Sequence, residues 1–192
     1  MLRIEGYVIV SANGMLADAN RVMPEALKFK GDLEFFTGGL DRVDIVVHGR
    51  NSFEDQPNSP LRKRIILTHR VTGLAADPEN AKATLWNPAG ASFEDACAHA
   101  GVRDGTAAII GGPGVFEMFL DRYDTFWLSE APLVTLPGGE GCFPGVPDDS
   151  PQAVLAAHGL QPREVRILDA AKEVRVTAWR RARPYLLRAS TS

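Results

Sequence analysis

An apolar run leads into a glycine cluster at residues 107–116, which read AAIIGGPGVF. Three glycines in four residues leave the backbone free of side chains, so that it can approach a ligand closely. The helix expected just beyond them begins with unpaired backbone N–H groups, which favour an anion such as a phosphate. The pattern therefore predicts a strand, a phosphate-binding turn and a helix, in that order.

Two other strand ends carry side chains that suit the same kind of ligand. Residues 44–52 read DIVVHGRNS, and residues 64–70 read RIILTHR. Guanidinium groups pair strongly with phosphates, and the carboxyl ends of parallel strands meet at one edge of a sheet. Three such strand ends suggest one long anionic ligand laid across the sheet.

The composition agrees with a small-molecule partner. The chain has 192 residues, 45% of them hydrophobic and 23% charged, which fits one domain, 1–192, with a substantial core. A net charge of −3 gives no electrostatic case for nucleic acid or a membrane as the main partner. The two cysteines and four histidines show no metal-ligand spacing, so we expect no metal site and a cytoplasmic location. The oligomeric state stays open, a homodimer included.

Strand-like and helix-like segments alternate along the chain, which is typical of the α/β class. Strands are expected at residues 2–11, 43–48, 64–67, 83–86, 106–110 and 125–128. Helices are expected at about 27–38, 92–100 and 115–122, the second with a capping box formed by Ser92 and Asp95. Residues 132–162 are rich in proline and glycine and are expected to be mostly irregular. Residues 164–169 and 174–180 then form a hairpin, so the predicted sheet is mostly parallel and ends in antiparallel strands.

Several short motifs follow one another in the order found in the dihydrofolate reductase superfamily, which the chain resembles over about residues 2–180. They are VIVSANGMLA (8–17), Met23-Pro24, GDLEFF (31–36), VHGR (47–50), IILT (65–68), IGG (110–112) and Phe143-Pro144. The superfamily also contains the reductase domain of bacterial riboflavin biosynthesis. The resemblance implies a three-layer α/β/α fold with a central sheet of eight strands. It also implies NADPH as cofactor and hydride transfer to a pterin or a pyrimidine.

The resemblance places a cofactor site along the three turns and a short flap. Arginines beside a ribose phosphate favour NADPH over NADH, since NADH has no 2′-phosphate for them to bind. The flap is expected to cover the nicotinamide and exclude water. The expected cofactor-binding residues are Ala17, Gly49, Arg50, Ser52, Thr68, His69, Arg70, Ile110, Gly111, Gly112, Gly114, Val115 and Phe116.

The resemblance also implies a substrate site around one carboxyl group. Asp32 would supply or relay the proton that accompanies hydride transfer, and Phe36 would pack on the substrate ring one helical turn later. Arg62 matches the position that binds the glutamate carboxylate of folate, and Ser129 the hydroxyl behind the acid. An alternative is that Asp32 only interacts with the dipole of its helix.

The chain departs from the family pattern at several positions. Glu25 replaces the aromatic residue after Met-Pro, two extra residues separate Pro24 from Asp32, and Phe116 replaces a tyrosine. Two alternatives to a pterin reductase therefore stay open. One is a pyrimidine reductase of the riboflavin type, with Arg62, Lys63 and Arg64 holding a substrate phosphate. The other is a non-catalytic NADPH-binding protein.

Overall fold

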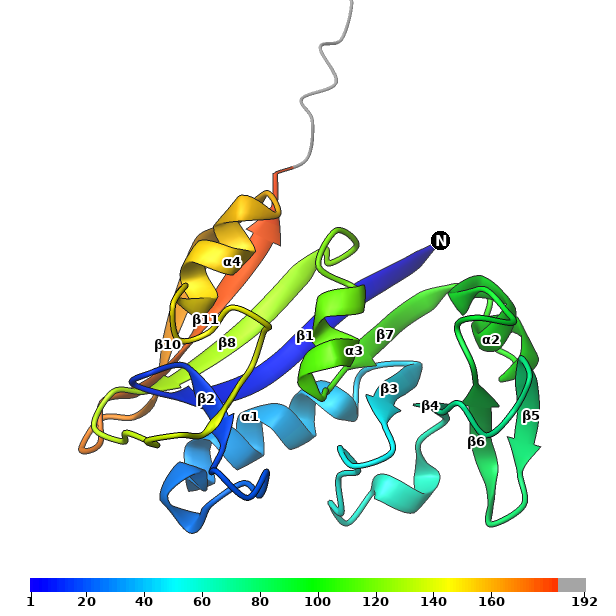
Figure 1. The fold of residues 1–192 in the computed structure, drawn as a ribbon, viewed down its shortest axis with the longest axis horizontal. Coiled ribbons are helices and arrows are strands. Elements are labelled where there is room, and N and C mark those ends of the chain that lie inside the picture. Colours follow the sequence, from blue (N-terminus) through cyan, green and yellow to red (C-terminus); the bar gives the residue numbers. More distant parts are fainter. Residues whose placement is uncertain (183–192) are drawn as a thin grey trace, which may run out of the picture.

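The computed structural model describes residues 1–182 and is built on a nine-stranded sheet (Figure 1). The strand order is β10-β11-β8-β1-β7-β3-β4-β6-β5. Strands β8, β1, β7, β3, β4 and β6 run parallel, whereas β10, β11 and β5 are antiparallel to their neighbours. The strands are β1 Leu2–Ser11, β3 Ile45–Gly49, β4 Arg64–Leu67, β5 Leu74–Asp77, β6 Asn80–Trp86, β7 Gly105–Ile109, β8 Thr125–Ala131, β10 Leu160–Asp169 and β11 Val174–Arg181.

Helices cover both faces of this sheet, as the alternation of buried side chains requires. One face packs against α1 (Lys30–Leu40) through Tyr7, Val46 and Ala108. The other face carries Ile45, Val47 and Ile109, and it packs against α2 (Phe93–His99), α3 (Pro113–Met118) and α4 (Pro151–Ala157). The predicted three-layer, mostly parallel architecture with a terminal antiparallel hairpin is confirmed.

The number of strands differs from the eight that the resemblance implied. Strand β5 forms a hairpin with β6 at the second edge of the sheet, so both edges end in antiparallel strands. Its short sequence, Leu-Ala-Ala-Asp, has no β-branched or aromatic residue and gives little strand signal. Two further short strands, β2 (Met15–Ala17) and β9 (Glu140–Gly141), pair outside the main sheet.

The sequence predicted the position of α2 correctly, but it did not predict α4. The expected capping box is present, because Ser92 Oγ accepts from Asp95 N and the Asp95 side chain accepts from Ser92 N. Helix α4 lies inside the segment expected to be irregular, where Ser150 caps it and Pro151 occupies its first turn. The expected start of α1 was wrong by one turn, since Glu25–Leu27 is a separate 3-10 helix (η1). No helix within residues 1–182 combines the length and apolar character needed to cross a membrane.

Candidate active site

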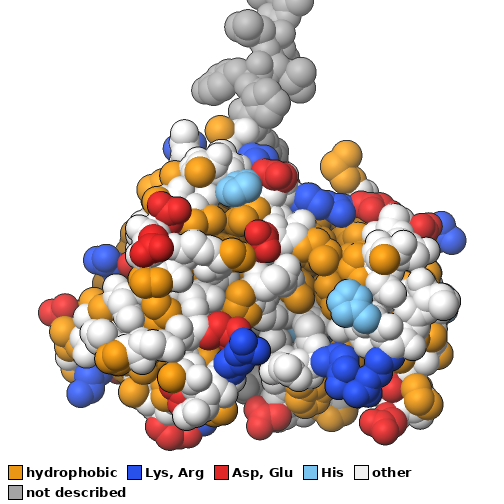
Figure 2. Space-filling model, viewed as in Figure 1, with side chains coloured by type: hydrophobic (Ala, Val, Ile, Leu, Met, Phe, Trp, Pro, Cys, Tyr) orange, Lys and Arg blue, Asp and Glu red, His pale blue; other side chains and the backbone are white. Residues whose placement is uncertain are grey.

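A cleft of about 1180 Å³ opens at the carboxyl ends of the parallel strands. Its walls come from α1, the flap around β2, and the loops after β3, β4 and β7. On the face drawn in Figure 2, a large group of Lys and Arg side chains lies toward the right of the lower half, and a smaller one lies near the middle with acidic atoms beside it. The cleft is large enough for an extended ligand together with a second small molecule.

The glycine turn forms one wall of the cleft. Gly111 has φ +111°, which favours glycine, and its carbonyl oxygen accepts a hydrogen bond of 2.8 Å from Gly49 N. Gly112 has φ −77°, so its backbone needs no glycine. A Cβ on Gly114 would meet no atom within 4 Å, which leaves open space at the start of α3. Four neighbours of these glycines also line the cleft, namely Ile110, Pro113, Val115 and Phe116.

The loops after β3 and β4 form the adjoining wall. Ser52 N donates to Gly49 O at 3.1 Å, which closes the turn that carries Arg50. Arg50 and His69 are exposed on the rim, while Ser52 is half-buried and Thr68 is buried. Arg70 is exposed and does not line the cleft, although its backbone N–H donates to Thr68 Oγ1 at 3.2 Å. The structure thus brings all the expected cofactor residues except Arg70 into one cleft.

The expected acid lies at the other end of the cleft. Asp32 and Phe36 stand one turn apart on α1, and Ser129 faces them from β8. Burial raises the pKa of the Asp32 carboxyl from 3.8 to about 6, and a hydrogen bond with Ser129 partly opposes that rise. A carboxyl with this pKa exchanges a proton readily near neutral pH.

The flap beside Asp32 is fixed to the segment before β9. Asn13 Nδ2 donates to Leu136 O, and Asn13 Oδ1 accepts from Leu136 N, both at 3.0 Å. An aspartate could not make the first of these bonds, which explains asparagine at this position. The same flap carries Ala17, which is buried and lines the cleft.

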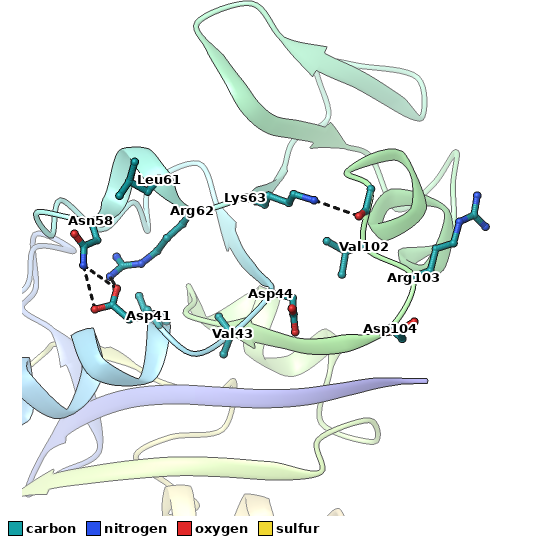
Figure 3. A pocket seen from close by; sticks show the side chains of 12 residues that line it. Asp41, Val43, Asp44, Asn58, Leu61, Arg62, Lys63, Val102, Arg103 and Asp104 are labelled. Carbon is teal, nitrogen blue, oxygen red and sulfur yellow. Dashed lines mark hydrogen bonds and ion pairs between the residues drawn. The ribbon is translucent and has the colours of Figure 1, made fainter.

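Arg62 does not line the cleft, so the structure does not bring it together with Asp32 and Phe36 as the resemblance implied. Its Nη2 donates to Asp41 Oδ1 at 2.6 Å, and its Nη1 donates to Glu54 Oε2 at 2.8 Å. Figure 3 shows Arg62 turned toward Asp41 and Asn58, beside a separate surface hollow. Arg64 is fully buried, and Lys63 Nζ donates to Gly101 O at 3.2 Å. These three residues thus have partners within the protein, and none of them lines the cleft.

Sequence reasoning missed an aromatic group on the α1 side of the sheet. Tyr7 and Trp127 pack at a centroid distance of 6.4 Å, and both line the cleft beside Phe35 and Phe36. Glu5 Oε2 accepts from Tyr7 Oη at 2.6 Å and from Trp127 Nε1 at 3.1 Å. The period-2 alternation of a strand carries the signal, since Tyr7 lies two residues before Ile9 and Trp127 two before Ser129.

Residues 1–182 contain no group of three His, Cys, Asp or Glu side chains placed to hold a metal ion. Burial raises the pKa of the Cys142 thiol to about 12, so this side chain stays neutral near pH 7.

No protein-family model matches the sequence, and no curated protein matches it in sequence. Solved structures do match in shape. A protein from Shewanella sp. PV-4 described as a riboflavin biosynthesis protein superposes with a TM-score of 0.63 at 18% identity, over 94% of this chain and 99% of its own. A dihydrofolate reductase from Enterococcus faecalis, in complex with NADP(H) and RAB-propyl, superposes with a TM-score of 0.62 at 18% sequence identity. This match covers 94% of this chain and 97% of that one.

A third solved structure is a two-activity protein from Thermotoga maritima. It is a diaminohydroxyphosphoribosylaminopyrimidine deaminase/5-amino-6-(5-phosphoribosylamino)uracil reductase, with a TM-score of 0.61 at 16% identity. The match covers 94% of this chain and 56% of that one. At such low identities the matches show the fold alone, and they confirm the fold expected from the sequence.

Proposed function

We propose that this chain, whose fold is that of the dihydrofolate reductases and the riboflavin-pathway reductases, is an NADPH-dependent reductase of a pterin-like heterocycle. The observation that carries the proposal is the continuity of the cleft. One end offers Arg50, Ser52 and the glycine turn, and the other offers the Asp32 carboxyl. This combination suits a phosphate-bearing cofactor next to a ring that needs a proton.

The cofactor end suits a dinucleotide with an additional phosphate. Arg50 and His69 on the rim would meet the 2′-phosphate, while Ser52 and Thr68 would donate to phosphate oxygens. The bare backbone from Gly111 to Gly114 would allow the pyrophosphate to approach closely. When bound, NADPH supplies the hydride.

The substrate end suits a flat ring that becomes protonated on nitrogen. Phe36 would give the ring an apolar surface, and Ser129 would orient the carboxyl of Asp32 beside it. With a pKa of about 6, Asp32 would hold a proton at its carboxyl oxygen in a useful fraction of molecules near neutral pH. Its role would be to pass that proton to the ring nitrogen beside the reduced carbon.

A second candidate substrate is a ribosylaminopyrimidine phosphate. Arg62 is paired with Asp41 and Glu54, which removes the expected partner for a folate carboxylate. Arg21, Lys28 and Lys30 line the cleft with exposed side chains, whose surface ion pairs with Glu140, Glu25 and Glu34 are weak, and they would attract a phosphate instead. This observation favours a substrate whose anionic group enters past η1 rather than past Arg62.

The test is NADPH oxidation with dihydrofolate, dihydrobiopterin and the ribosylaminopyrimidine phosphate, for the parent protein and Asp32→Asn. We expect turnover of one substrate, a loss of about 10² to 10⁴ in kcat for Asp32→Asn, and an unchanged Kd for NADPH. Glu34→Gln, an exposed change on the same helix, is the control and should keep full activity. Full activity in Asp32→Asn would contradict the acid role, and NADPH binding without turnover of any substrate would favour a non-catalytic protein.

A further inference from the structure

A buried group of charged side chains lies directly behind the loop that carries Arg50 and Ser52. Glu54 is at its centre, with a side chain only 5% exposed, and it also borders the cleft. One carboxylate oxygen accepts from Arg64 Nη2, and the other accepts from Arg62 Nη1 at 2.8 Å and from Gln56 N at 3.1 Å. Burial raises the pKa of Glu54, but the bonds from Arg64 and Arg62 outweigh it, so the net pKa lies below its ordinary value. Glu54 is therefore ionised.

Arg64 connects this carboxylate to His48. Its guanidinium also donates to Ser59 O at 3.0 Å and lies 3.4 Å from His48 Nε2 through Nη1. His48 Nδ1 lies 2.7 Å from Gly49 O. A carbonyl oxygen only accepts, so Nδ1 carries the hydrogen and Nε2 accepts from Arg64. Burial lowers the pKa of His48, which agrees with a neutral imidazole in this position.

Gly49 joins this buried group to both turns of the cofactor end. Its carbonyl oxygen, already bound by His48, also accepts from Ser52 N at 3.1 Å. Its N–H donates to Gly111 O at 2.8 Å. The Ser52 hydroxyl packs against the glycine turn, because a Cβ on Gly112 would lie 3.2 Å from Ser52 Oγ. A continuous series of hydrogen bonds thus runs from Glu54 through Arg64, His48 and Gly49 to Gly111.

We propose that His48 and Glu54 are positioning residues, which hold the Gly49–Ser52 turn and the Gly111–Gly112 turn in the geometry that binds the cofactor phosphates. The proposal rests on the proposed function, since it concerns NADPH binding at the same cleft. Neither residue needs to touch the reacting atoms. A loop held in its binding conformation loses less entropy when the ligand arrives, so binding is tighter.

The sharpest test compares two substitutions of His48. Asparagine places its side-chain N–H close to the position of Nδ1 and can still donate to Gly49 O. Phenylalanine keeps the ring shape and its packing against Phe53, which lies at a centroid distance of 6.1 Å, but it removes both polar nitrogens. We expect His48→Phe to weaken the Kd for NADPH about tenfold or more and His48→Asn to stay within about threefold of the parent.

The control separates positioning from a general loss of stability. Leu155→Ala removes a fully buried side chain of α4, which does not line the cleft, and it should lower the melting temperature without changing the Kd. All affinities are measured by fluorescence titration well below each melting temperature. If His48→Phe does not fold, Glu54→Gln takes its place, because it keeps the size of Glu54 and removes the negative charge between two arginines. It should also weaken NADPH binding about tenfold.

The outcomes distinguish this inference from the proposed function. A parent protein that does not bind NADPH contradicts both. A parent that binds NADPH, together with a folded His48→Phe or Glu54→Gln of unchanged affinity, overturns the positioning role and leaves the reductase proposal intact. Equal weakening in His48→Phe and His48→Asn also overturns it, because the bond to Gly49 would then be irrelevant.

Discussion

At the scale of single residues, burial of the ionised Asp32 carboxyl lowers the free energy of unfolding. Its carboxyl has a pKa of about 6 in the folded protein against 3.8 in the unfolded chain. The folded state binds this proton more tightly, so the free energy of unfolding falls as the pH rises from 3.8 to about 6 and stays lower above that window. An active-site acid with a raised pKa commonly has this effect.

Asp32→Asn should therefore stabilise the protein in a pH-dependent way. Asparagine stays neutral, so at pH 8 the variant should exceed the parent by about 1 to 3 kcal/mol in unfolding free energy. The gain should shrink as the pH falls through the window between the two pKa values, so that only about a third of it remains near pH 4.5. Urea unfolding at both pH values measures this, with Glu34→Gln as the exposed control. A gain of the same size at both pH values would show that burial does not raise the pKa of Asp32.

At the scale of elements, the start of α1 is set by a close approach to the C-terminal hairpin. A Cβ on Gly31 would lie 2.0 Å from Leu168 O on β10, so only glycine lets the helix lie this near the strand. Leu168 packs against a small apolar cluster with Leu27, Phe29 and Val174. Since Asp32 follows Gly31 directly, this contact also fixes the place of the carboxyl in the cleft.

Gly31→Ala should push α1 away from β10 and destabilise the fold by about 1 to 3 kcal/mol. Gly38→Ala on the same helix is the matched control, because its Cβ would only approach Arg42 Nη1, at 3.5 Å. Gly38→Ala should leave the free energy of unfolding unchanged or raise it by up to about 1 kcal/mol, since glycine is a poor helix former. Urea midpoints of the two variants test this. Equal effects at both positions would show that the contact with Leu168 does not determine where α1 lies.

At the scale of the whole molecule, the cleft draws its walls from all six parallel strands or the loops after them, together with α1. A ligand that fills it contacts segments from Tyr7 to Glu140 in the sequence. Binding to the folded state alone stabilises that state by mass action. The melting temperature therefore reports cofactor preference without any knowledge of the substrate.

NADPH should raise the melting temperature more than NADH does at the same concentration, because only NADPH has a 2′-phosphate for Arg50. At a hundred times its Kd, NADPH adds about 2.7 kcal/mol, which corresponds to roughly 5 to 10 °C for a chain of this size. Arg50→Ala should reduce the preference for NADPH about tenfold. Arg103→Ala is the control, an exposed arginine beside the hollow in Figure 3 and outside the cleft. Equal shifts with the two cofactors would contradict the 2′-phosphate site.

Much of this architecture could be predicted from local sequence signals. The bounds of β1 and β4 agree with their apolar runs, and the capping box of Ser92 fixed the start of α2. The spacing of Asp32 and Phe36 placed both on one face of a helix. These features depend on residues close together in the chain, whose conformations are limited by backbone sterics and by local hydrogen bonds.

The tertiary structure alone decided which distant side chains meet. Arg62 was expected to bind a substrate, but it pairs with Asp41, which lies 21 residues away. Tyr7 and Trp127 meet beside α1 only because β1 and β8 pair in one particular register. A charged or aromatic side chain can interact with many different groups, and the residues next to it in the sequence do not determine which of these groups it contacts. The packing of the sheet and its helices makes that selection, since it fixes which groups lie within hydrogen-bond distance.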